Sequence, residues 1–419
     1  MIKPSGINKI SIGNILIFIS GALTLTFKSG YIAGTILMLP LIIFDAYKNI
    51  KKPLNKEQKI ILITYLTYFI SQFIFIIHDT EYKLSEFELP SRCLLGILIF
   101  LFISRNKISF HYISNGIATG AIIGGAIAIY EKVFLGWGRA FDNIMPIQAG
   151  DTCMSLGLMS LCLSFYHIKK NNKKYFIFFI AAALSGITGS LLSGSRGGWI
   201  LLPVNIFIII SMNRDLISGR IIGALLLLIT ILISVCSIPS LGVYSRVNLA
   251  VQDLHRFTDK QWAGNDGTNS LGIRLMLWKS NWNSFKEKPL LGWGNFGISK
   301  SYNYQYEKGD IPLFIRDYGI NTHAHNQFLD EMAKKGLFGL ASLLSIFLIP
   351  ATMLHKKEKD KESREIKHIS QSGLLLIFST IDYFISQAFF NHSSGISFYF
   401  ITISILLGFS LRIINTKYD

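Results

Sequence analysis

Long uninterrupted apolar runs recur along almost the whole chain, and they constrain its fold more than any other feature. Most of them approach the roughly 20 residues that a helix needs to cross a bilayer. They lack the alternation of apolar and polar positions that marks the strands of a membrane barrel. Half of the 419 residues are hydrophobic and 16% are charged, whereas a soluble domain usually carries about 25% charged residues. The sequence therefore predicts an all-α integral membrane protein.

Twelve runs qualify as predicted transmembrane helices, although the second, fourth and eighth are short for a bilayer core of ~30 Å. The one long connection follows the ninth. It divides the chain into transmembrane helices 1–9 over residues 1–238, a large loop over 239–335, and helices 10–12 over 336–419. The predicted spans are 11–27, 31–46, 59–78, 92–104, 113–134, 150–167, 175–192, 197–212, 220–238, 336–354, 370–390 and 395–415.

The net charge of +16 is distributed as a topology signal and not as a nucleic-acid interface. Basic clusters occupy every second connection, as the positive-inside rule predicts for cytoplasmic loops, where they would also attract anionic lipid head groups. We therefore expect both termini in the cytoplasm, the large loop outside, and no nucleic-acid partner. The clusters are Lys48, Lys51, Lys52, Lys56 and Lys59; Arg105 and Lys107; Lys169, Lys170, Lys173 and Lys174; Arg214 and Arg220; and 356–367.

The four cysteines all fall within or at the edges of predicted spans, so the large loop holds no disulfide and no zinc-type cysteine spacing. They are Cys93, Cys153, Cys162 and Cys236. The first apolar run has no small-residue cleavage site after it, and we expect it to be retained as a span. Within the large loop two stretches look helical, 272–287 and 326–335, and the second leads into the tenth span.

Two arginines are candidates for binding an anionic group. Arg196 stands in Ser195-Arg196-Gly197-Gly198, between two predicted spans, where glycines allow close approach of another group. An arginine at membrane depth is costly unless paired; the alternative is a snorkelling side chain that fixes the turn. Arg274 opens the aromatic helix of the loop. A guanidinium makes planar, bidentate contacts to phosphate, although an ordinary solvated loop arginine is the plainer interpretation.

The segment His323-Ala324-His325-Asn326 lies where the large loop enters the tenth span. Histidine is the usual general base near neutral pH, and a helix N-terminus disfavours its charged form. A capping or packing role is one alternative. Metal binding by the His-x-His pair is another, but the pair lacks a nearby Asp, Glu or Cys arranged as in a typical zinc site.

Asp382 lies inside the eleventh predicted span and is nearly alone among charged residues at mid-depth in the spans. A buried acid needs a partner, and we expect an arginine or histidine of the site. His392 follows that span on the outer side and is a weaker candidate.

The segment Gly292–Gly297 matches the G-x-G-x-x-G pattern, but a dinucleotide site also needs a preceding strand and a βαβ setting. We interpret it as a glycine-rich turn packed by Trp293 and Phe296. The chain has no Walker loop, no nucleophile elbow and no zincin motif, so we expect no nucleotide and no cofactor.

Taken together, these motifs resemble the O-antigen ligase/O-antigen polymerase superfamily, and within it the lipopolysaccharide O-antigen ligases. The resemblance covers most of the chain: about twelve spans, a large periplasmic loop between spans nine and ten, and three local motifs. The last motif is the most specific, and the first two are shared with polymerases. The motifs are Ser195-Arg196-Gly197-Gly198; Arg274-x-x-x-Trp278 running on to 289–294; and His325-Asn326 followed by Gly336-x-x-Gly339.

The resemblance implies a glycosyltransferase at the periplasmic face of a Gram-negative inner membrane. The donor would be undecaprenyl-diphosphate-linked O-antigen and the acceptor the lipid A–core oligosaccharide. Arg196 and Arg274 would bind the diphosphate, and His325 would deprotonate the acceptor hydroxyl. Asp382, His323 and Asn326 would support them. Two arginines can neutralise the leaving group without a metal, and a single displacement would invert the anomeric centre.

Two other functions stay open at this point. An O-antigen polymerase would use the same chemistry with a glycan acceptor. A transporter or flippase predicts charged residues at mid-depth in several spans and often internal repeats, whereas the polar residues here concentrate at the outer face.

Overall fold

The structure is a computed structural model, and it describes residues 9–78, 83–195, 197–216, 270–360 and 363–412, with a few isolated positions between 219 and 252. Every regular element among these residues is helical. Eight of the described helices are long and apolar enough to cross a membrane, so the chain is a multi-pass membrane protein, as predicted. These helices are α2 (Gly30–Lys48), α3 (Lys56–His78), α4 (Glu88–Arg105), α5 (Phe110–Ile129), α7 (Lys173–Ser193), α14 (Gln327–Glu358), α15 (Arg364–Ser386) and α16 (Ser393–Ser410).

Three further helices fall on predicted spans without meeting the same length and apolarity. The helices α1 (Lys9–Ala22) and α8 (Leu202–Met212) are apolar but short. The helix α6 (Pro146–Lys169) is long enough, but it carries buried polar residues along its length. The ninth predicted span, 220–238, lies outside the continuously described residues. The total of twelve spans therefore stays a prediction.

Two helices, α4 and α15, have ends that differ from the predicted spans. The fourth span begins earlier than predicted, because Glu88 and Arg92 form an ion pair of 2.6 Å one turn apart inside α4. Paired charges can occupy a helix end that apolarity alone would exclude. The eleventh span ends earlier than predicted. The helix α15 stops at Ser386, and Gln387 is extended, with φ −153° and ψ 149°.

Glycines set the closest helix crossings. A Cβ on Gly186 of α7 would lie 2.8 Å from the Cα of Gly157 on α6. A Cβ on Gly21 of α1 would lie 2.6 Å from the carbonyl carbon of Gly116 on α5. Small residues let backbones approach in this way, which is how membrane helices gain packing where lipid offers no hydrophobic drive.

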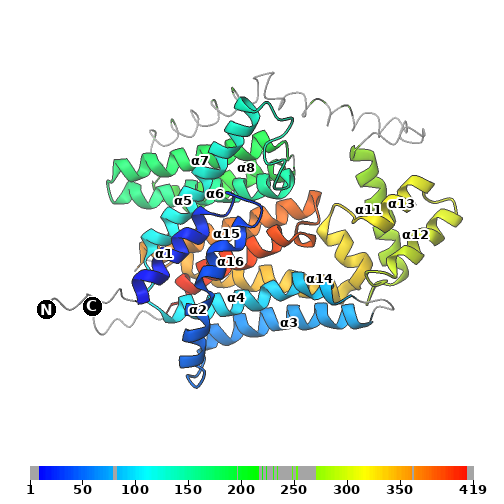
Figure 1. Cartoon of the computed structure of the whole chain (residues 1–419), viewed down its shortest axis with the longest axis horizontal. Helices are drawn as coiled ribbons and strands as arrows, with labels where there is room; N and C mark the ends of the chain where they lie inside the picture. The colour runs from blue at the N-terminus through cyan, green and yellow to red at the C-terminus, as the bar shows by residue number, and fades with distance from the viewer. Residues whose placement is uncertain are drawn as a thin grey trace.

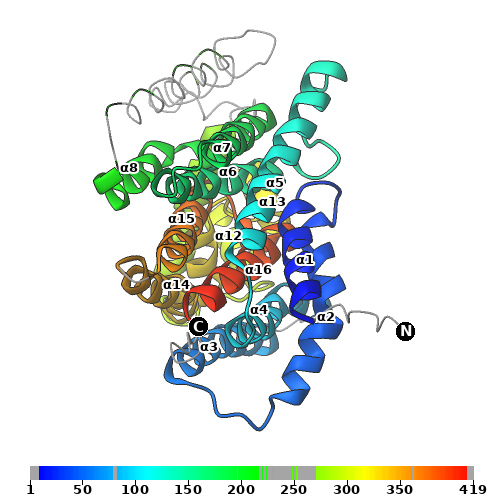
Figure 2. The ribbon, with the colours of Figure 1, turned by 90° about the vertical axis from the view of Figure 1, so that its left-hand side faces the viewer.

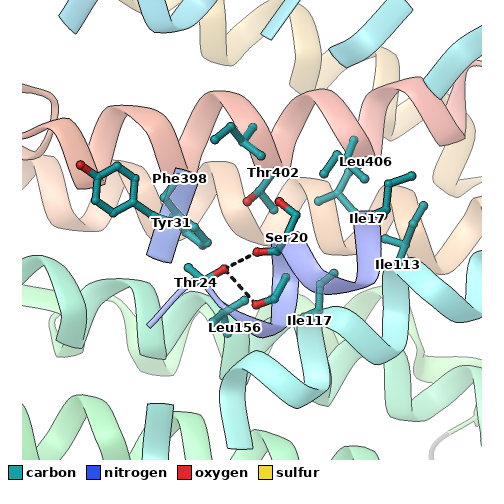
Figure 3. A pocket seen from close by; sticks show the side chains of 13 residues that line it. Ile17, Ser20, Thr24, Tyr31, Ile113, Ile117, Leu156, Phe398, Thr402 and Leu406 are labelled. Atoms are coloured by element: carbon teal, nitrogen blue, oxygen red, sulfur yellow. Dashed lines mark hydrogen bonds between the residues drawn. The ribbon is translucent and has the colours of Figure 1, made fainter. Parts of the chain in front are cut away.

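The helices lie in a layered bundle. Figure 1 shows α3 and α4 along one edge, α6 and α7 along the opposite edge, and α15 and α16 between them, and Figure 2 shows the same order from the side. A small cavity of about 30 Å³ lies among α1, α2, α5, α6 and α16 (Figure 3). In it the Thr24 hydroxyl donates to the carbonyl oxygens of Ser20 and Gly21, so this polar atom is satisfied by the backbone of the last turn of α1.

The loop residues from 270 onward form a separate helical unit at one end of the bundle (Figure 1). Both predicted loop helices are confirmed, as α11 (Ser270–Glu287) and as the first part of α14. The structure adds α12 (Ile298–Glu307) and α13 (Leu313–Asn321), which the sequence did not predict because they are short and polar. A small core joins them; it contains Met276, Leu277, Ile298, Tyr302, Ile311, Ile315 and Ala333.

A kink in α14 ties this unit to the bundle. Gly336 has φ 63° and ψ −157° inside the helix. The turn of residues 289–294 packs against the kink: the backbone N–H of Leu337 donates to the carbonyl of Pro289 at 2.8 Å, and that of Gly294 donates to the carbonyl of Lys334 at 2.8 Å. The G-x-G-x-x-G segment is therefore a turn at a helix junction, as interpreted from the sequence.

Candidate functional site

His325 lies in the short connection between α13 and α14, and two features hold its backbone in place. Its φ is +49°, a left-handed conformation that is uncommon outside glycine. The next residue, Asn326, caps α14: its side-chain oxygen accepts from the backbone N–H of Leu329 at 3.0 Å. The Asn326 amide also donates to the carbonyl of Ile385 on α15 at 3.1 Å. The capping role, which was one alternative for the histidine segment, belongs to Asn326. Because Asn326 also bonds to Ile385, it holds the neighbouring His325 near the end of α15.

A chain of side-chain hydrogen bonds runs through the His325 ring. The Nδ1 atom lies 2.9 Å from Oε1 of Gln387, and the Nε2 atom lies 3.1 Å from the Tyr318 hydroxyl. The Nε2 atom of Gln387 lies 3.2 Å from Nε2 of His392. A carboxamide oxygen can only accept, so Nδ1 of His325 carries the hydrogen. The lone pair of Nε2 is left to accept from Tyr318 or from a substrate hydroxyl.

The surroundings keep the three histidines of this region neutral at neutral pH. Burial lowers the pKa of His325; the hydrogen bond to Gln387 opposes this, and the positive charge of Arg274 lowers the pKa further. Burial lowers the pKa of His323 to about 3, and burial and the nearby His325 lower the pKa of His392. A neutral imidazole with an accessible lone pair can accept a proton, so the geometry and the pKa of His325 both suit a base.

His323 lies beside His325, with ring centroids 4.4 Å apart. Its Nδ1 atom accepts from the backbone N–H of His325 at 3.2 Å, so His323 stabilises the loop conformation. Among the described residues no group of three or more His, Cys, Asp or Glu side chains is placed to hold a metal ion.

Arg274 lies half-buried on α11. Its positive charge acts both on the His325 ring and on the carboxylate of Asp151 in α6. Arg274 and His325 are therefore close enough to interact electrostatically.

Arg196 itself lies outside the described residues, but the residues on either side of it are held between α6 and α15. The Ser195 hydroxyl donates to Oδ1 of Asp151 at 3.0 Å. A Cβ on Gly197 would lie 2.0 Å from the hydroxyl oxygen of Ser386. A glycine at this position leaves the Ser386 hydroxyl in place, whereas a larger residue would make it move, which gives the Ser-Arg-Gly-Gly sequence a steric reason.

Asp382 acts on the same turn. Its Oδ2 atom accepts from the backbone N–H of Leu201 at 3.0 Å, and this is the hydrogen bond that the structure gives it, with none to His325. Asp382 is joined by a second buried acid in the described helices, because Asp151 on α6 is 0% exposed. The sequence did not single out Asp151, because it has polar neighbours and stands at the edge of the predicted span 150–167.

Sequence reasoning missed several residues that the structure brings to this region. Gln387 and Tyr318 contact the His325 ring, and Asp151 holds Ser195. Arg139 donates from Nε to the carbonyl of Ser193 at 2.7 Å. The sequence offered one signal for Gln387, its place as a polar residue at the predicted outer edge of span eleven. It offered none that would connect Tyr318, Asp151 or Arg139 with the motifs.

Fold and site define a class: a membrane protein, helical in its described elements, in which a histidine connection and a glycine-rich turn both contact the end of one helix and a loop arginine acts electrostatically on the histidine. Comparison with known proteins gives the family. The family model described as O-Antigen ligase matches residues 179–344, a range that contains all three motifs. The chain belongs to the O-antigen ligase superfamily.

Two relatives extend the match beyond that range. An uncharacterized protein of Haemophilus influenzae is 31% identical over 390 residues, 92% of this chain and 95% of the relative. A protein of Escherichia coli K12 named O-antigen ligase is 23% identical over 209 residues, 50% of this chain and 48% of the relative.

Proposed function

We propose that the protein is an O-antigen ligase that transfers O-polysaccharide from undecaprenyl diphosphate to the lipid A–core oligosaccharide. The observation that carries the proposal is the His325 ring. Its Nδ1 atom lies 2.9 Å from Gln387 Oε1, its pKa is lowered by burial, and a loop arginine acts on it. Family membership supports the reaction class, and the relative named O-antigen ligase supports the acceptor.

In the proposed reaction His325 Nε2 takes the proton of an acceptor-sugar hydroxyl as the oxygen attacks the anomeric carbon of the donor. The bond from that carbon to the diphosphate oxygen breaks, and undecaprenyl diphosphate leaves with the bond's electron pair. One displacement inverts the anomeric centre, because the attacking oxygen and the leaving group lie on opposite faces. The proton stays on His325 until product release.

Arg274 and Arg196 would bind the diphosphate and neutralise the charge that grows on it. The position of Arg274 supports its role, since its charge acts on both His325 and Asp151. For Arg196 the support comes from its neighbours, which pack against α6 and α15. Asp382 would support the reaction through the backbone of this turn, and Asn326 and His323 through the conformation of the His325 connection.

The proposed location is the inner membrane of a Gram-negative bacterium, with both termini in the cytoplasm and the site on the periplasmic side. The basic clusters in alternate connections support this orientation. Donor and acceptor both carry lipid anchors, so they would reach the site from the membrane.

The test is reconstitution of the purified protein with lipid-linked O-antigen and rough lipopolysaccharide, in the presence of chelator and without nucleotide. We expect ligated product with an inverted linkage. A requirement for ATP or a divalent metal would overturn the mechanism. A deletion strain separates ligase from polymerase: loss of ligation leaves long chains on the lipid carrier, whereas loss of polymerisation leaves single repeat units on lipid A–core.

A further inference from the structure

A polar cavity of about 290 Å³ lies beside the first turns of α14, and Arg274 is not among the residues that line it. Its walls come from α3, the start of α4, the turn at Asn295, the first turns of α14 and the connection before α16. One of its lining residues, Gln327, follows His325 by two positions, so their Cα atoms are at most about 7.6 Å apart.

The walls of the cavity are rich in paired hydrogen-bonding groups. Gln72 donates to Glu331 at 2.8 Å, Lys335 pairs with Glu331 at 3.0 Å, and Asn295 donates to Glu86 at 2.8 Å. One position earlier on the same helix, Lys334 pairs with Asp330 at 2.9 Å. Donors and acceptors therefore alternate over short distances, and each hydroxyl of a sugar both donates and accepts.

Aromatic side chains complete the lining, namely Tyr68, Phe296 and Phe390. A pyranose ring has an apolar face of C–H groups that can pack on such rings, and ligand pockets commonly combine apolar walls with a few polar groups. A lipid chain is a poor occupant, because it would strip water from charged groups without replacing their hydrogen bonds. A diphosphate is also a poor occupant, because the three carboxylates in the wall outnumber the two lysines.

The position of the cavity distinguishes the two glycans of the proposed reaction. The Ser-Arg turn is held by α6 and α15, whereas the cavity is bounded by α3 and α4, on the opposite edge of the bundle (Figure 1). In an inverting displacement the attacking hydroxyl approaches from the side opposite the leaving diphosphate. The cavity therefore lies on the side from which the acceptor would approach.

A hydrogen-bond connection joins the cavity wall to the His325 connection. The Asp330 carboxylate, which lines the cavity, accepts from the backbone N–H of Ala324 at 3.2 Å and from the amide of Asn391 at 3.2 Å. The residue between the two loop histidines is thus fixed by the same side chain that would contact the ligand.

From these observations we infer that this cavity binds the acceptor saccharide next to the sugar whose hydroxyl is attacked. The inference rests on the proposed function. It assigns to Asn295, Gln72 and Glu331 contacts with sugar hydroxyls, and to Phe296 and Phe390 contacts with a ring face.

The experiment uses the full chain in proteoliposomes and varies donor and acceptor concentrations independently. Asn295→Ala removes one amide from the wall, and Asn295→Trp fills the space. Asn303→Ala and Asn303→Trp are matched controls, because Asn303 lies exposed on α12, outside the cavity. Gln72→Ala, with Thr67→Ala as its control on the exposed side of α3, repeats the test from a different helix.

We expect the KM for lipopolysaccharide to rise about three- to tenfold in Asn295→Ala, as for one lost hydrogen bond, and further in Asn295→Trp. The KM for the lipid-linked donor and all control variants should be unchanged. If the donor KM rises instead, the cavity binds the donor glycan and the inference is wrong; if neither KM changes, it is also wrong. An equal rise in both, with lowered thermal stability, would mark the residue as structural and contradict the inference.

A binding measurement keeps this test separate from the proposed function. Lipid-free core oligosaccharide is added to the protein without donor, and saturation-transfer NMR reports contact. We expect binding to the wild type and to Asn303→Trp, and none to Asn295→Trp. If the wild type transfers no glycan yet shows this pattern, the proposed function fails while the saccharide cavity stands. If the wild type transfers glycan yet Asn295→Trp binds normally, only the cavity assignment fails.

Discussion

The Nδ1 atom of His325 on the α13–α14 connection lies 2.9 Å from Oε1 of Gln387, which follows the last residue of α15. A neutral amide here fixes the ring's tautomer and orientation without adding charge. A carboxylate in the same place would stabilise the imidazolium and raise its pKa. The amide therefore leaves burial and Arg274 free to keep His325 unprotonated.

The first prediction follows from this pair. Gln387→Glu should raise the pKa of His325, and a base works only when unprotonated. The acidic limb of the kcat/KM profile should therefore move to higher pH, with slower transfer below the new limb. Asn303→Asp adds the same charge on exposed α12 and should leave the limb in place. An unmoved limb in Gln387→Glu would show that His325 is not the group that the profile reports.

Removing the base itself should be more severe. His325→Ala should lower kcat by about 10²- to 10⁴-fold, the usual contribution of one positioned general base, with donor binding retained. His355→Ala, a change of an exposed histidine at the other end of α14, should be silent. Near-normal ligation by a correctly inserted His325→Ala protein would rule out the proposed mechanism.

Arg274 should be sensitive even to replacement by lysine. Arg274→Lys keeps the charge but loses the planar fork that contacts two oxygens at once, so the KM for the donor should rise about tenfold or more. Arg274→Ala should do more: with the positive charge gone, the pKa of His325 rises and the acidic limb moves to higher pH. The control is Lys279→Ala, an exposed change on the same helix. Unchanged donor KM in both Arg274 variants would exclude diphosphate binding by this residue.

Asp382 should act through the turn that contains Arg196 and not through His325. Asp382→Ala removes the acceptor for the Leu201 N–H and should raise the donor KM, with the pH limb unchanged. Asp382→Asn keeps a carbonyl oxygen and should restore most of the activity. A shift of the limb in Asp382→Ala would instead connect this acid to the base.

The kink in α14 provides a test of stability. In Gly336→Ala a Cβ would lie 2.3 Å from the carbonyl carbon of Leu290, at φ 63°. The variant should be destabilised by more than about 1 kcal/mol, seen as a lower Tm in detergent. Gly309 also has a positive φ, 78°, and nothing lies within 4 Å of an added Cβ, so Gly309→Ala reports the cost of a positive φ without a clash. Equal effects of the two substitutions would show that the contact with the 289–294 turn adds nothing.

Some of the site could be predicted because its chemistry is local in sequence. The Ser195-Arg196-Gly197-Gly198 and His325-Asn326 motifs carry their own signals, a charged side chain among glycines and a base before a helix. Even there the structure supplied the reason: Gly197 lies directly against the hydroxyl of Ser386 on another helix. The partners of the base and of the turn, Gln387 and Asp151, carry no local signal of their own.

By itself, the sequence determined that the chain is helical and crosses a membrane, because apolar runs of this length satisfy their backbone hydrogen bonds only as helices in lipid. Its motifs also selected Arg274 and His325. Only the tertiary structure decided what holds them: Gln387 lies 62 positions from His325 along the chain, and Asp382 is paired with a backbone amide 181 positions away. Such pairings depend on how helix ends meet in space, and no pattern of polarity along one segment records that.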